Sequence, residues 1–401
     1  MSILIYAVAD YPRGMATAER IKLITRTLKE AGHPSEIALI HATELASTVE
    51  AGPLSSTHDG TPYVYLNGQS QRPTGTMAKV LDTIRGVFGA ALHLRKSHKA
   101  GQVKKVLFYT PNFLKIAPAL LLAKLYKLPI YFELCEIRTS TGSAAKGSRL
   151  RALMSIGDKL TETIGPKLVD GLIVISQRIK EFYLLAGVDE QNLFYLPALV
   201  DAGIFESDLQ PFTELVDKKY FLSAGSFGEK EGVSYLVEAF GLVVKKGSEA
   251  LLVFTGSPSE EAKSKVFSQA KELGVSEKLL FTGFISREQL SWCYANAEAL
   301  LACRTNSDFS QFGFPTKLVE YMASGTAIVA TEVGAIKESL SDGVSAFIAV
   351  PEDADSIALK MKQVLENPKL AKSVGNTAKA IALNKYDYRQ YIESLPLFMD
   401  L

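Results

Sequence analysis

The sequence predicts an α/β protein made of two Rossmann-like, doubly wound domains that face a cleft. Three observations favour this class. The chain has 401 residues, enough for two or three domains. Its 47% hydrophobic and 22% charged residues are ordinary for a folded protein and exclude a disordered or low-complexity chain. In both halves, short β-rich runs alternate with segments of helical periodicity, the pattern of a parallel sheet covered by helices on both faces.

The first half begins with a strand and continues as a βαβ series. Residues 3–8 form an unbroken apolar run, as expected for a parallel strand that is buried on both faces. Apolar residues then recur near the helical period, and Gly32 can end that helix. The elements predicted here are strands over 3–8, 35–40, 106–109, 130–134 and 171–175, and helices over 16–32 and 115–127.

The second half repeats this alternation after a weakly periodic stretch with two prolines, residues 197–212. Its predicted strands cover 220–224, 250–255, 279–282, 299–302, 327–330 and 346–349, and its predicted helices cover 233–244, 260–273 and 317–322. We therefore expect domains over 1–203 and 204–375. Residues 376–401 are expected to form a helical segment that packs back toward the first domain.

Cysteine usage and the N-terminus indicate a cytoplasmic protein. Three cysteines are too few for a disulfide scaffold, and no C-x-x-C pair or Cys/His cluster indicates zinc, so we expect buried free thiols. The N-terminus lacks a charged region followed by a long apolar run. The longest mostly apolar window, residues 116–128, is too short to cross a bilayer.

Charge is divided unevenly along the chain. Residues 1–203 contain 24 Lys and Arg against 17 Asp and Glu, whereas residues 204–401 contain 20 against 26. The halves therefore differ in sign although the formal net charge is only +1. This asymmetry indicates different partners for the two halves, with compositional drift as the alternative.

The stretch from Gly313 onward carries the strongest signal of chemistry. Gly313 and Pro315 precede a predicted helix, whose first amides and partial positive charge suit a phosphate. Lys317 and Glu320 lie three residues apart on one face of that helix. The cation suits a diphosphate and the carboxylate suits a sugar diol. A surface ion pair between these two side chains is the alternative.

Residues 314–325 have the pattern F-P-x-K-x-x-E-Y-x-A-x-G. With this motif the chain resembles the retaining GT-B glycosyltransferases of glycosyltransferase family 4, in the branch of bacterial polysaccharide assembly. Other strings similar to that family follow in family order at 170–176, 199–205, 225–232 and 281–284. The resemblance therefore covers nearly the whole chain.

This resemblance implies a retaining glycosyltransferase that moves a sugar from a nucleotide-sugar donor, UDP- or GDP-linked, to a glycan or lipid-linked acceptor. In such enzymes the first domain binds the acceptor and the second binds the donor. The implied setting is the assembly of cell-surface polysaccharide or glycolipid, with no nucleic-acid partner. No cofactor besides the donor and no metal are expected, because lysines and backbone amides are available to the diphosphate.

The candidate site residues come from this resemblance and from the places where the chain departs from it. Catalytic roles fall on Glu136, Lys230, Arg304 and Lys317. Donor-binding roles fall on Gly14, Gly225, Ser226, Lys230, Phe284, Gly313, Phe314, Thr316, Lys317 and Glu320. Among these, Glu320 matches the ribose-binding acid and Lys230 the lysine that contacts the diphosphate. Gly14 matches a loop glycine near acceptor and phosphate, with an ordinary turn glycine as the alternative. Arg13 beside it meets either an anion or solvent.

The chain departs from the family pattern at four places. Phe312 stands where the family has an acid near the transferred sugar, and Asp308 is the nearest substitute. Glu136 stands near the position of a first-domain histidine or aspartate, with Arg138 as its partner or as a phosphate ligand. Ser226 replaces an arginine, for which Arg304 is the candidate replacement unless it is a surface arginine.

The fourth departure is Glu231, which separates Lys230 from Gly232. Together the departures leave two alternatives open. One is a catalytically degenerate partner subunit that binds nucleotide without turning it over. The other is a nucleotide-sugar 2-epimerase of the same fold, against which the motif of residues 314–325 argues.

Residues 76–105 have the pattern of a basic amphipathic helix. Seven cations face one acid, Asp82, and apolar residues recur at helical spacing. A helix of this kind is typical of an anionic membrane surface, so we expect a peripheral protein at the inner face of the plasma membrane. Lys146, Arg149 and Arg151 are candidates for extending the basic surface. The alternative is a helix packed on the first domain's sheet with a solvated basic end.

Overall fold

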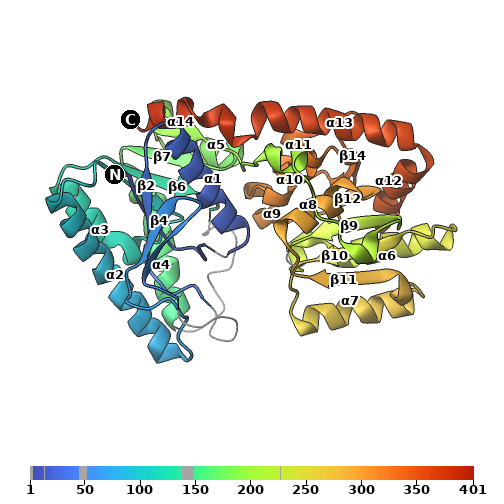
Figure 1. Ribbon diagram of the computed structural model, residues 1–401, viewed down its shortest axis with the longest axis horizontal. Helices are drawn as coiled ribbons and strands as arrows, with labels where there is room; N and C mark the ends of the chain where they lie inside the picture. The colour runs from blue at the N-terminus through green and yellow to red at the C-terminus, as the bar shows by residue number, and fades with distance from the viewer. Residues whose placement is uncertain (1–2, 13, 45–51, 138–148, 226) are drawn as a thin grey trace. The chain divides into compact units, whose positions relative to one another are not determined.

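The computed structural model describes residues 3–12, 14–44, 52–137, 149–225 and 227–401 (Figure 1). The chain divides into two compact units. The first consists of Met1–Pro197 and Tyr388–Leu401, and the second of Ala198–Asp387. The first unit therefore ends a few residues before the expected boundary at Gly203, and the chain rejoins it from Tyr388 onward.

The first unit is built on an eight-stranded sheet with the order β3-β4-β2-β1-β5-β6-β7-β8. Its strands are β1 (Ile3–Ala7), β2 (Ser35–Leu39), β3 (Ser55–His58), β4 (Thr61–Tyr65), β5 (Lys105–Tyr109), β6 (Ile130–Leu134), β7 (Gly171–Val174) and β8 (Leu193–Tyr195). All neighbouring pairs are parallel except β3 and β4. Every residue of β1, β5 and β6 is buried, which confirms the strands predicted from their apolar runs.

The hairpin of β3 and β4 escaped the sequence analysis. Its strands are short, and β3 is polar and largely exposed, so neither an apolar run nor a clear alternation marks it. The sequence contains one indication of this hairpin, its two-residue loop Asp59-Gly60. Both residues have positive φ angles, as the favoured hairpin turns require.

The helices of the first unit are α1 (Ala16–Glu30), α2 (Thr76–Lys99), α3 (Phe113–Leu125), α4 (Arg149–Thr163), α5 (Gln177–Leu185) and the short C-terminal α14 (Ser394–Phe398). The predicted helices at 16–32 and 115–127 are confirmed as α1 and α3. Helix α1 buries Ile21, Ile24 and Leu28 on one face, as its period predicts. In the described residues no helix combines the length and the apolar character needed to cross a bilayer.

The second unit has a six-stranded sheet that is parallel throughout, with the order β11-β10-β9-β12-β13-β14. Its strands are β9 (Tyr220–Ala224), β10 (Leu251–Thr255), β11 (Leu279–Gly283), β12 (Ala299–Ala302), β13 (Ile328–Thr331) and β14 (Phe347–Ala349). All six were predicted within a residue or two. With the first unit, this sheet confirms an α/β protein of two Rossmann-like units.

The second sheet is covered by α6 (Val233–Lys245), α7 (Glu260–Glu272), α8 (Arg287–Ala295), α9 (Asp308–Phe312), α10 (Thr316–Ser324), α11 (Ala335–Ser339), α12 (Ala354–Glu366) and α13 (Pro368–Lys385). Helix α6 packs against α7 and α12. Phe221, Phe240 and Phe254 lie in the hydrophobic core between these helices and the sheet. Burying such large apolar side chains stabilises the unit and fixes where its strands end.

Candidate active site

The carboxyl edge of the second sheet has a point where the chain changes direction. From β9 the chain passes through α6 to β10 on one side, and it later returns through α8 to β12 on the other side of β9. The loops that follow β9 and β12 therefore leave the sheet in opposite directions. In open α/β sheets such a point forms the crevice where ligands bind.

Two backbone contacts hold these loops together. The Thr305 amide donates to the Lys230 carbonyl at 3.1 Å. Gly232, whose φ is 60°, lies so close to the second loop that a Cβ there would be 2.2 Å from the Cys303 carbonyl oxygen. Only glycine fits this position. The contacts bring Lys230 and Arg304, from separate loops, to the same end of the sheet.

Glu231 lies at the centre of the charged groups. Its Oε2 is 2.7 Å from Lys317 Nζ, and both side chains are almost buried. Lys317 Nζ also donates to the Ala224 carbonyl at 3.0 Å, at the end of β9. Burial opposes ionisation of Glu231, but Lys317, Arg304 and Lys230 outweigh it and hold the pKa of this carboxyl below its usual range. Three cations, Lys317, Arg304 and Lys230, thus act on the carboxylate of Glu231.

Arg304, two residues after the end of β12, is buried. It is 4% exposed, and within the described part of the chain its Nε and Nη1 have no hydrogen-bond partner. Burial lowers the pKa of its guanidinium, which the nearby Glu231 only partly offsets. The alternative of a surface arginine is therefore wrong. A buried, incompletely paired cation is unfavourable by itself, so this position favours an anionic ligand.

Helix α10 supplies the third wall of the site. It begins at Thr316 after Pro315, and no side chain caps its N-terminus. Phe314 is buried against the Tyr386 ring, with 5.7 Å between ring centroids, which anchors the approach to the helix. The Tyr321 hydroxyl accepts from the Ala224 amide at 2.8 Å. The start of α10, with half-buried Gly313 and Thr316 beside it, is therefore fixed to the end of β9.

Glu320 has its own partners one turn further along α10. Its Oε1 is 3.1 Å from Arg287 Nη1, and its Oε2 accepts from the Tyr294 hydroxyl at 3.5 Å. Lys317 and Glu320 therefore pair with different side chains, Glu231 and Arg287. The sequence analysis missed Arg287 and Tyr294, because both come from α8 and no spacing relates α8 to α10.

Three neighbouring strands end in glycines with positive φ: Gly225 after β9, Gly256 after β10 and Gly283 at the end of β11. The Gly225 amide donates to Thr255 O at 3.0 Å. A Cβ at Gly256 would lie 2.5 Å from Gly225 O. Gly256 was not predicted as a site residue, although a Thr-Gly pair stands at the end of both β10 and β11. The glycines leave this edge of the sheet open to a close ligand.

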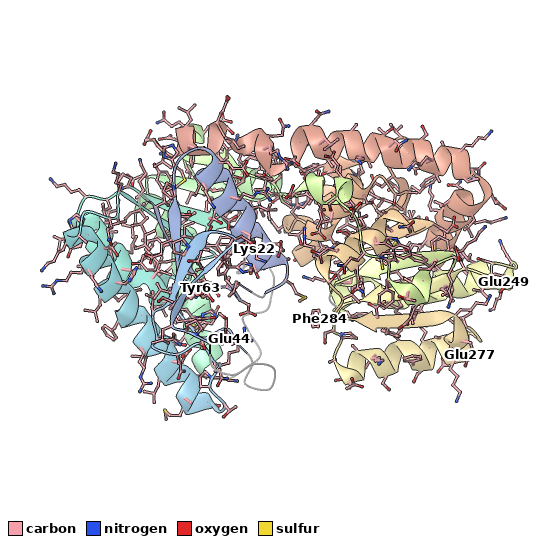
Figure 2. All side chains as sticks on the ribbon, viewed as in Figure 1. Lys22, Glu44, Tyr63, Glu249, Glu277 and Phe284 are labelled. Atoms are coloured by element: carbon pink, nitrogen blue, oxygen red, sulfur yellow. The ribbon has the colours of Figure 1, made fainter. Side chains whose placement is uncertain are left out.

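Phe284, Asp308 and Phe312 lie on the segments that follow β11 and β12. Phe284 follows β11 and is 71% exposed (Figure 2). Asp308 is the exposed first residue of α9, and Phe312, half-buried, is its last. Ser226, Arg13, Arg138 and Lys146 lie outside the described residues.

Gly14 and Glu136 belong to the first unit. A Cβ at Gly14 would lie 1.9 Å from Asp10 O, so this glycine is required by the turn itself. Glu136 follows β6 and lines a small pocket whose other walls include Thr110, Cys135, Asp158, Thr161 and Glu162. The pocket is rich in oxygen acceptors, which suits a ligand that presents hydroxyl or amine donors.

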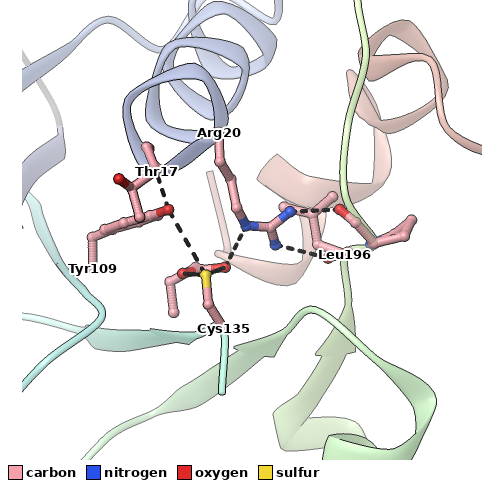
Figure 3. Close-up of polar contacts among 7 residues, drawn as sticks. Thr17, Arg20, Tyr109, Cys135 and Leu196 are labelled. Atoms are coloured by element: carbon pink, nitrogen blue, oxygen red, sulfur yellow. Dashed lines mark hydrogen bonds and ion pairs between the residues drawn. The ribbon is translucent and has the colours of Figure 1, made fainter. Parts of the chain in front are cut away.

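Beside this pocket, Arg20 forms a buried ion pair with Glu133 at 2.7 Å (Figure 3). Arg20 also donates to the carbonyls of Leu196 and Pro197, where the first unit ends. Cys135 Sγ is 3.1 Å from Glu133 Oε2, and burial together with Glu133 raises the pKa of this thiol well above its usual value. The cluster is therefore structural, and Cys135 is not an activated nucleophile.

The chain contains one D-x-D string, Asp353-Ala354-Asp355, the pattern that would indicate a bridging divalent metal. The expectation of no metal did not take this string into account. Asp353 caps α12, and its Oδ1 accepts from the Ser356 amide at 2.9 Å. Capping of this kind accounts for an aspartate at a helix start without a metal.

The second unit is similar to a family of glycosyl transferases. Residues 205–381, less than half of the chain, match the family model described as "Glycosyl transferases group 1". An uncharacterized glycosyltransferase of Methanocaldococcus jannaschii is 28% identical over 43% of this chain and 42% of its own length. An MMP alpha-(1->4)-mannosyltransferase of Mycolicibacterium hassiacum is 27% identical over 58% of this chain and 54% of its own. The chain thus spans about half the length of the curated relatives that it matches.

Solved structures are similar over the whole chain. Sucrose-phosphate synthase from Thermosynechococcus elongatus has a TM-score of 0.75 and 15% identity, covering 100% of this chain and 98% of its own. Anabaena HepE in complex with UDP has a TM-score of 0.70 and 15% identity, covering 100% of both chains. At this identity the likeness shows the fold alone, and that fold is the two-domain GT-B architecture.

Proposed function

We propose that this chain is a retaining glycosyltransferase that moves a sugar from a nucleotide-sugar donor to a glycan or lipid-linked acceptor, in the assembly of bacterial cell-surface polysaccharide or glycolipid. One observation carries the proposal: Arg304, buried and incompletely paired, lies at the switch point of the second sheet. The family match over residues 205–381 supports sugar transfer as the reaction. Mannosyltransferases among the relatives support it further.

In this proposal the second unit binds the donor. Arg304, Lys230 and Lys317 hold the diphosphate, together with amides at the start of α10. Glu231 holds Lys317 in place without cancelling the cluster's positive charge. Glu320 accepts hydrogen bonds from the ribose, and Arg287 orients that carboxylate.

The relatives suggest two nucleobases for the donor, uracil and guanine. HepE is described in complex with UDP and with UDP-glucose, and a relative in Mycolicibacterium smegmatis is named as GDP-mannose-dependent. We therefore propose a UDP- or GDP-linked sugar. We assign the exposed Phe284 to stacking on the base, since an aromatic ring offers a flat apolar face.

The chemistry proposed for these residues is mostly electrostatic. The bond from the sugar to the diphosphate breaks as the acceptor hydroxyl attacks from the same side, and a departing phosphate oxygen takes the hydroxyl proton. Cations held in place before the reaction stabilise the charge that develops on the leaving group. Glu136, in the oxygen-rich pocket of the first unit, is proposed to bind the acceptor.

Replacing Arg304 by glutamine tests the proposal. Calorimetric titration with UDP, GDP, ADP and dTDP should show binding of UDP or GDP to the wild type. Arg304→Gln should weaken it about 10- to 100-fold, because a hydrogen bond to a charged group contributes about 1.5–3 kcal/mol. The melting temperature of the ligand-free variant should not fall, since a buried and incompletely paired charge has been removed.

The matched control is Lys271→Gln, which removes one exposed cation from α7 and should leave affinity unchanged. A folded Arg304→Gln variant with wild-type affinity would remove the basis of the proposal. Release of nucleoside diphosphate only when an acceptor is present separates the transferase from its two alternatives. Release without acceptor indicates an epimerase or hydrolase, and binding without release indicates a degenerate partner subunit.

A further inference from the structure

Helix α2 turns its large apolar side chains away from the protein. The exposed side chains follow one stripe at helical spacing: Met77, Leu81, Ile84, Phe88 and Leu92, with Met77, Phe88 and Leu92 each at least 60% exposed. The sequence analysis gave as the alternative a helix packed on the first domain's sheet with a solvated basic end. Helix α2 does pack on the first unit and its basic end is exposed, but the side that it buries carries Asp82, Gly86, Ala90, Leu94 and Ser97 rather than the apolar stripe.

Close backbone contacts fix this orientation. A Cβ at Gly86 would lie 1.5 Å from the Ile40 carbonyl oxygen, and one at Gly89 would lie 2.1 Å from the Leu66 carbonyl oxygen. No other residue fits at either place, so α2 cannot rotate to bury its apolar stripe. Asp82, the only acid of α2, is buried. Its Oδ1 accepts hydrogen bonds from Gln69 Nε2 at 2.7 Å and from the side-chain Nδ2 of Asn67.

The neighbouring helices continue the apolar surface. Helix α3 packs against both α2 and α4, and Figure 1 shows α2 and α3 side by side in the first unit. On α3, Leu121 and Leu125 are 71% and 70% exposed. On α4, Leu153 and Ile156 are also exposed. An apolar surface spread over three adjacent helices exceeds the scattered exposed residues of an ordinary soluble protein.

The charges on this surface have one sign. Its exposed cations are Lys79, Arg85, Arg95, Lys96 and Lys99 on α2, Lys124 on α3, Lys127 just after it, and Lys159 on α4. Arg95 and Lys99 continue the apolar stripe, three and seven residues after Leu92. Within the described side chains of these helices no acid is exposed: Asp82 and Glu162 are buried, and Asp158 is half-buried.

We propose that the outer surface of α2, α3 and α4 docks on an anionic lipid bilayer. Apolar side chains enter the boundary between headgroups and acyl chains, while the lysine and arginine heads stay among anionic headgroups. The uniform positive charge favours this occupant over a second copy of the chain, since two such surfaces repel each other. The helices lie along the membrane plane rather than span it, in line with their composition.

Vesicle binding tests the proposal without any substrate, so its outcome is independent of the proposed transferase activity. In flotation at low salt, the full chain should bind equimolar phosphatidylglycerol–phosphatidylcholine vesicles and should not bind phosphatidylcholine alone. High salt should release it, because screening shortens the reach of the charges. Failure to float with the anionic vesicles at low salt would overturn the proposal.

Charge-reversal variants distinguish binding through this surface from a general effect of the protein's net charge. Each cation near an anionic surface raises the affinity about fivefold, so Arg95→Glu/Lys96→Glu/Lys99→Glu should lose at least about 100-fold. The control Lys245→Glu/Lys246→Glu/Lys271→Glu changes the same number of exposed cations in the second unit. Equal losses in the two triple variants would contradict the assignment.

Replacing exposed apolar residues by polar ones tests the apolar part of the surface. Phe88→Gln/Leu92→Gln should weaken vesicle binding, whereas the control Leu359→Gln/Leu370→Gln, also at exposed leucines, should not. Fluorescence of a Phe88→Trp variant should be quenched by brominated acyl chains. If instead the wild type is a dimer that Phe88→Gln/Leu92→Gln dissociates, and vesicles bind neither protein, the surface is a protein interface and the proposal fails.

Discussion

The structure gives Glu231 a different role from the one that the sequence suggests. In the sequence it interrupts a lysine–glycine pair, Lys230 and Gly232. In the structure it holds Lys317 against the end of β9 and lies within electrostatic range of Arg304. A carboxylate in this place orients Lys317, so we regard Glu231 as a positioning residue.

Removing this charge gives a pH-dependent prediction. The folded pKa of Glu231 is below its unfolded value, so its ionisation contributes stability at and above neutral pH. That contribution is lost as pH falls through the unfolded value, about 4.3, toward the folded one. Glu231→Gln should therefore lower the melting temperature at pH 7, and the difference from the wild type should shrink below about pH 4. A difference independent of pH, measured by thermal unfolding, would contradict the ion-pair account.

Glu320→Ala should weaken nucleotide binding by one to two decades without unfolding the protein. The proposed ribose hydrogen bonds to a charged acceptor are each worth about 1.5–3 kcal/mol. The half-exposed Arg287 loses its partner but keeps access to water, so stability should change little. Calorimetry and thermal unfolding measure both quantities, and unchanged donor affinity in the folded variant would exclude the ribose role.

At the scale of elements, the site is built where loops after β9 and β12 meet the start of α10. None of these segments is a site alone. The Thr305–Lys230 backbone bond and the Tyr321–Ala224 bond join them into one rigid edge. At Gly232 the two loops are so close that an added Cβ would clash with the Cys303 carbonyl oxygen.

Gly232→Ala should therefore cost more than backbone strain alone. The left-handed conformation costs a non-glycine residue about 1–2 kcal/mol, and the clash with Cys303 O must also push the two loops apart. The control is Gly274→Ala, which has φ of 73° but no atom within 4 Å of the added Cβ. We expect Gly232→Ala to melt lower than Gly274→Ala and to bind UDP or GDP more weakly. Equal melting temperatures and affinities would show that the loops do not need this contact.

At the scale of the whole molecule, the two units carry different chemistry. The second contains the cation cluster and the family match, whereas the first contains the oxygen-rich pocket of Glu136 and the cationic, apolar helices. This division agrees with the uneven charge of the two halves of the sequence. It supports a donor site in one unit and an acceptor and membrane surface in the other.

Turnover by the whole protein is expected to survive EDTA. Lys230, Arg304 and Lys317 supply the positive charge that a divalent metal would otherwise bring to the diphosphate. The measurement is nucleoside diphosphate release with an acceptor present, with and without the chelator. A complete loss that Mn²⁺ or Mg²⁺ restores would refute this prediction, and Asp353 would then be the first residue to replace.

The sequence by itself determined the fold class, because continuous apolar runs and helical periods follow from local burial and backbone geometry. Residues 3–8, 130–134 and 220–224 were placed as strands for this reason, and the structure confirms them. The motif at 314–325 likewise marked the start of α10. The hairpin of β3 and β4 was missed because both strands are short and β3 is polar and exposed, so no apolar run or clear alternation marks them.

Only the tertiary structure decided which charges meet and which surfaces remain open. Arg304 and Glu231 are 73 residues apart in the chain, and Glu320 meets Arg287 on another helix. No spacing rule relates such pairs, because sheet order and loop packing bring them together. The direction of the α2 stripe depends in the same way on Gly86 and Gly89, which let the helix approach the sheet through its small side. Periodicity defines the two faces of a helix, but the packing around it decides which one meets the solvent.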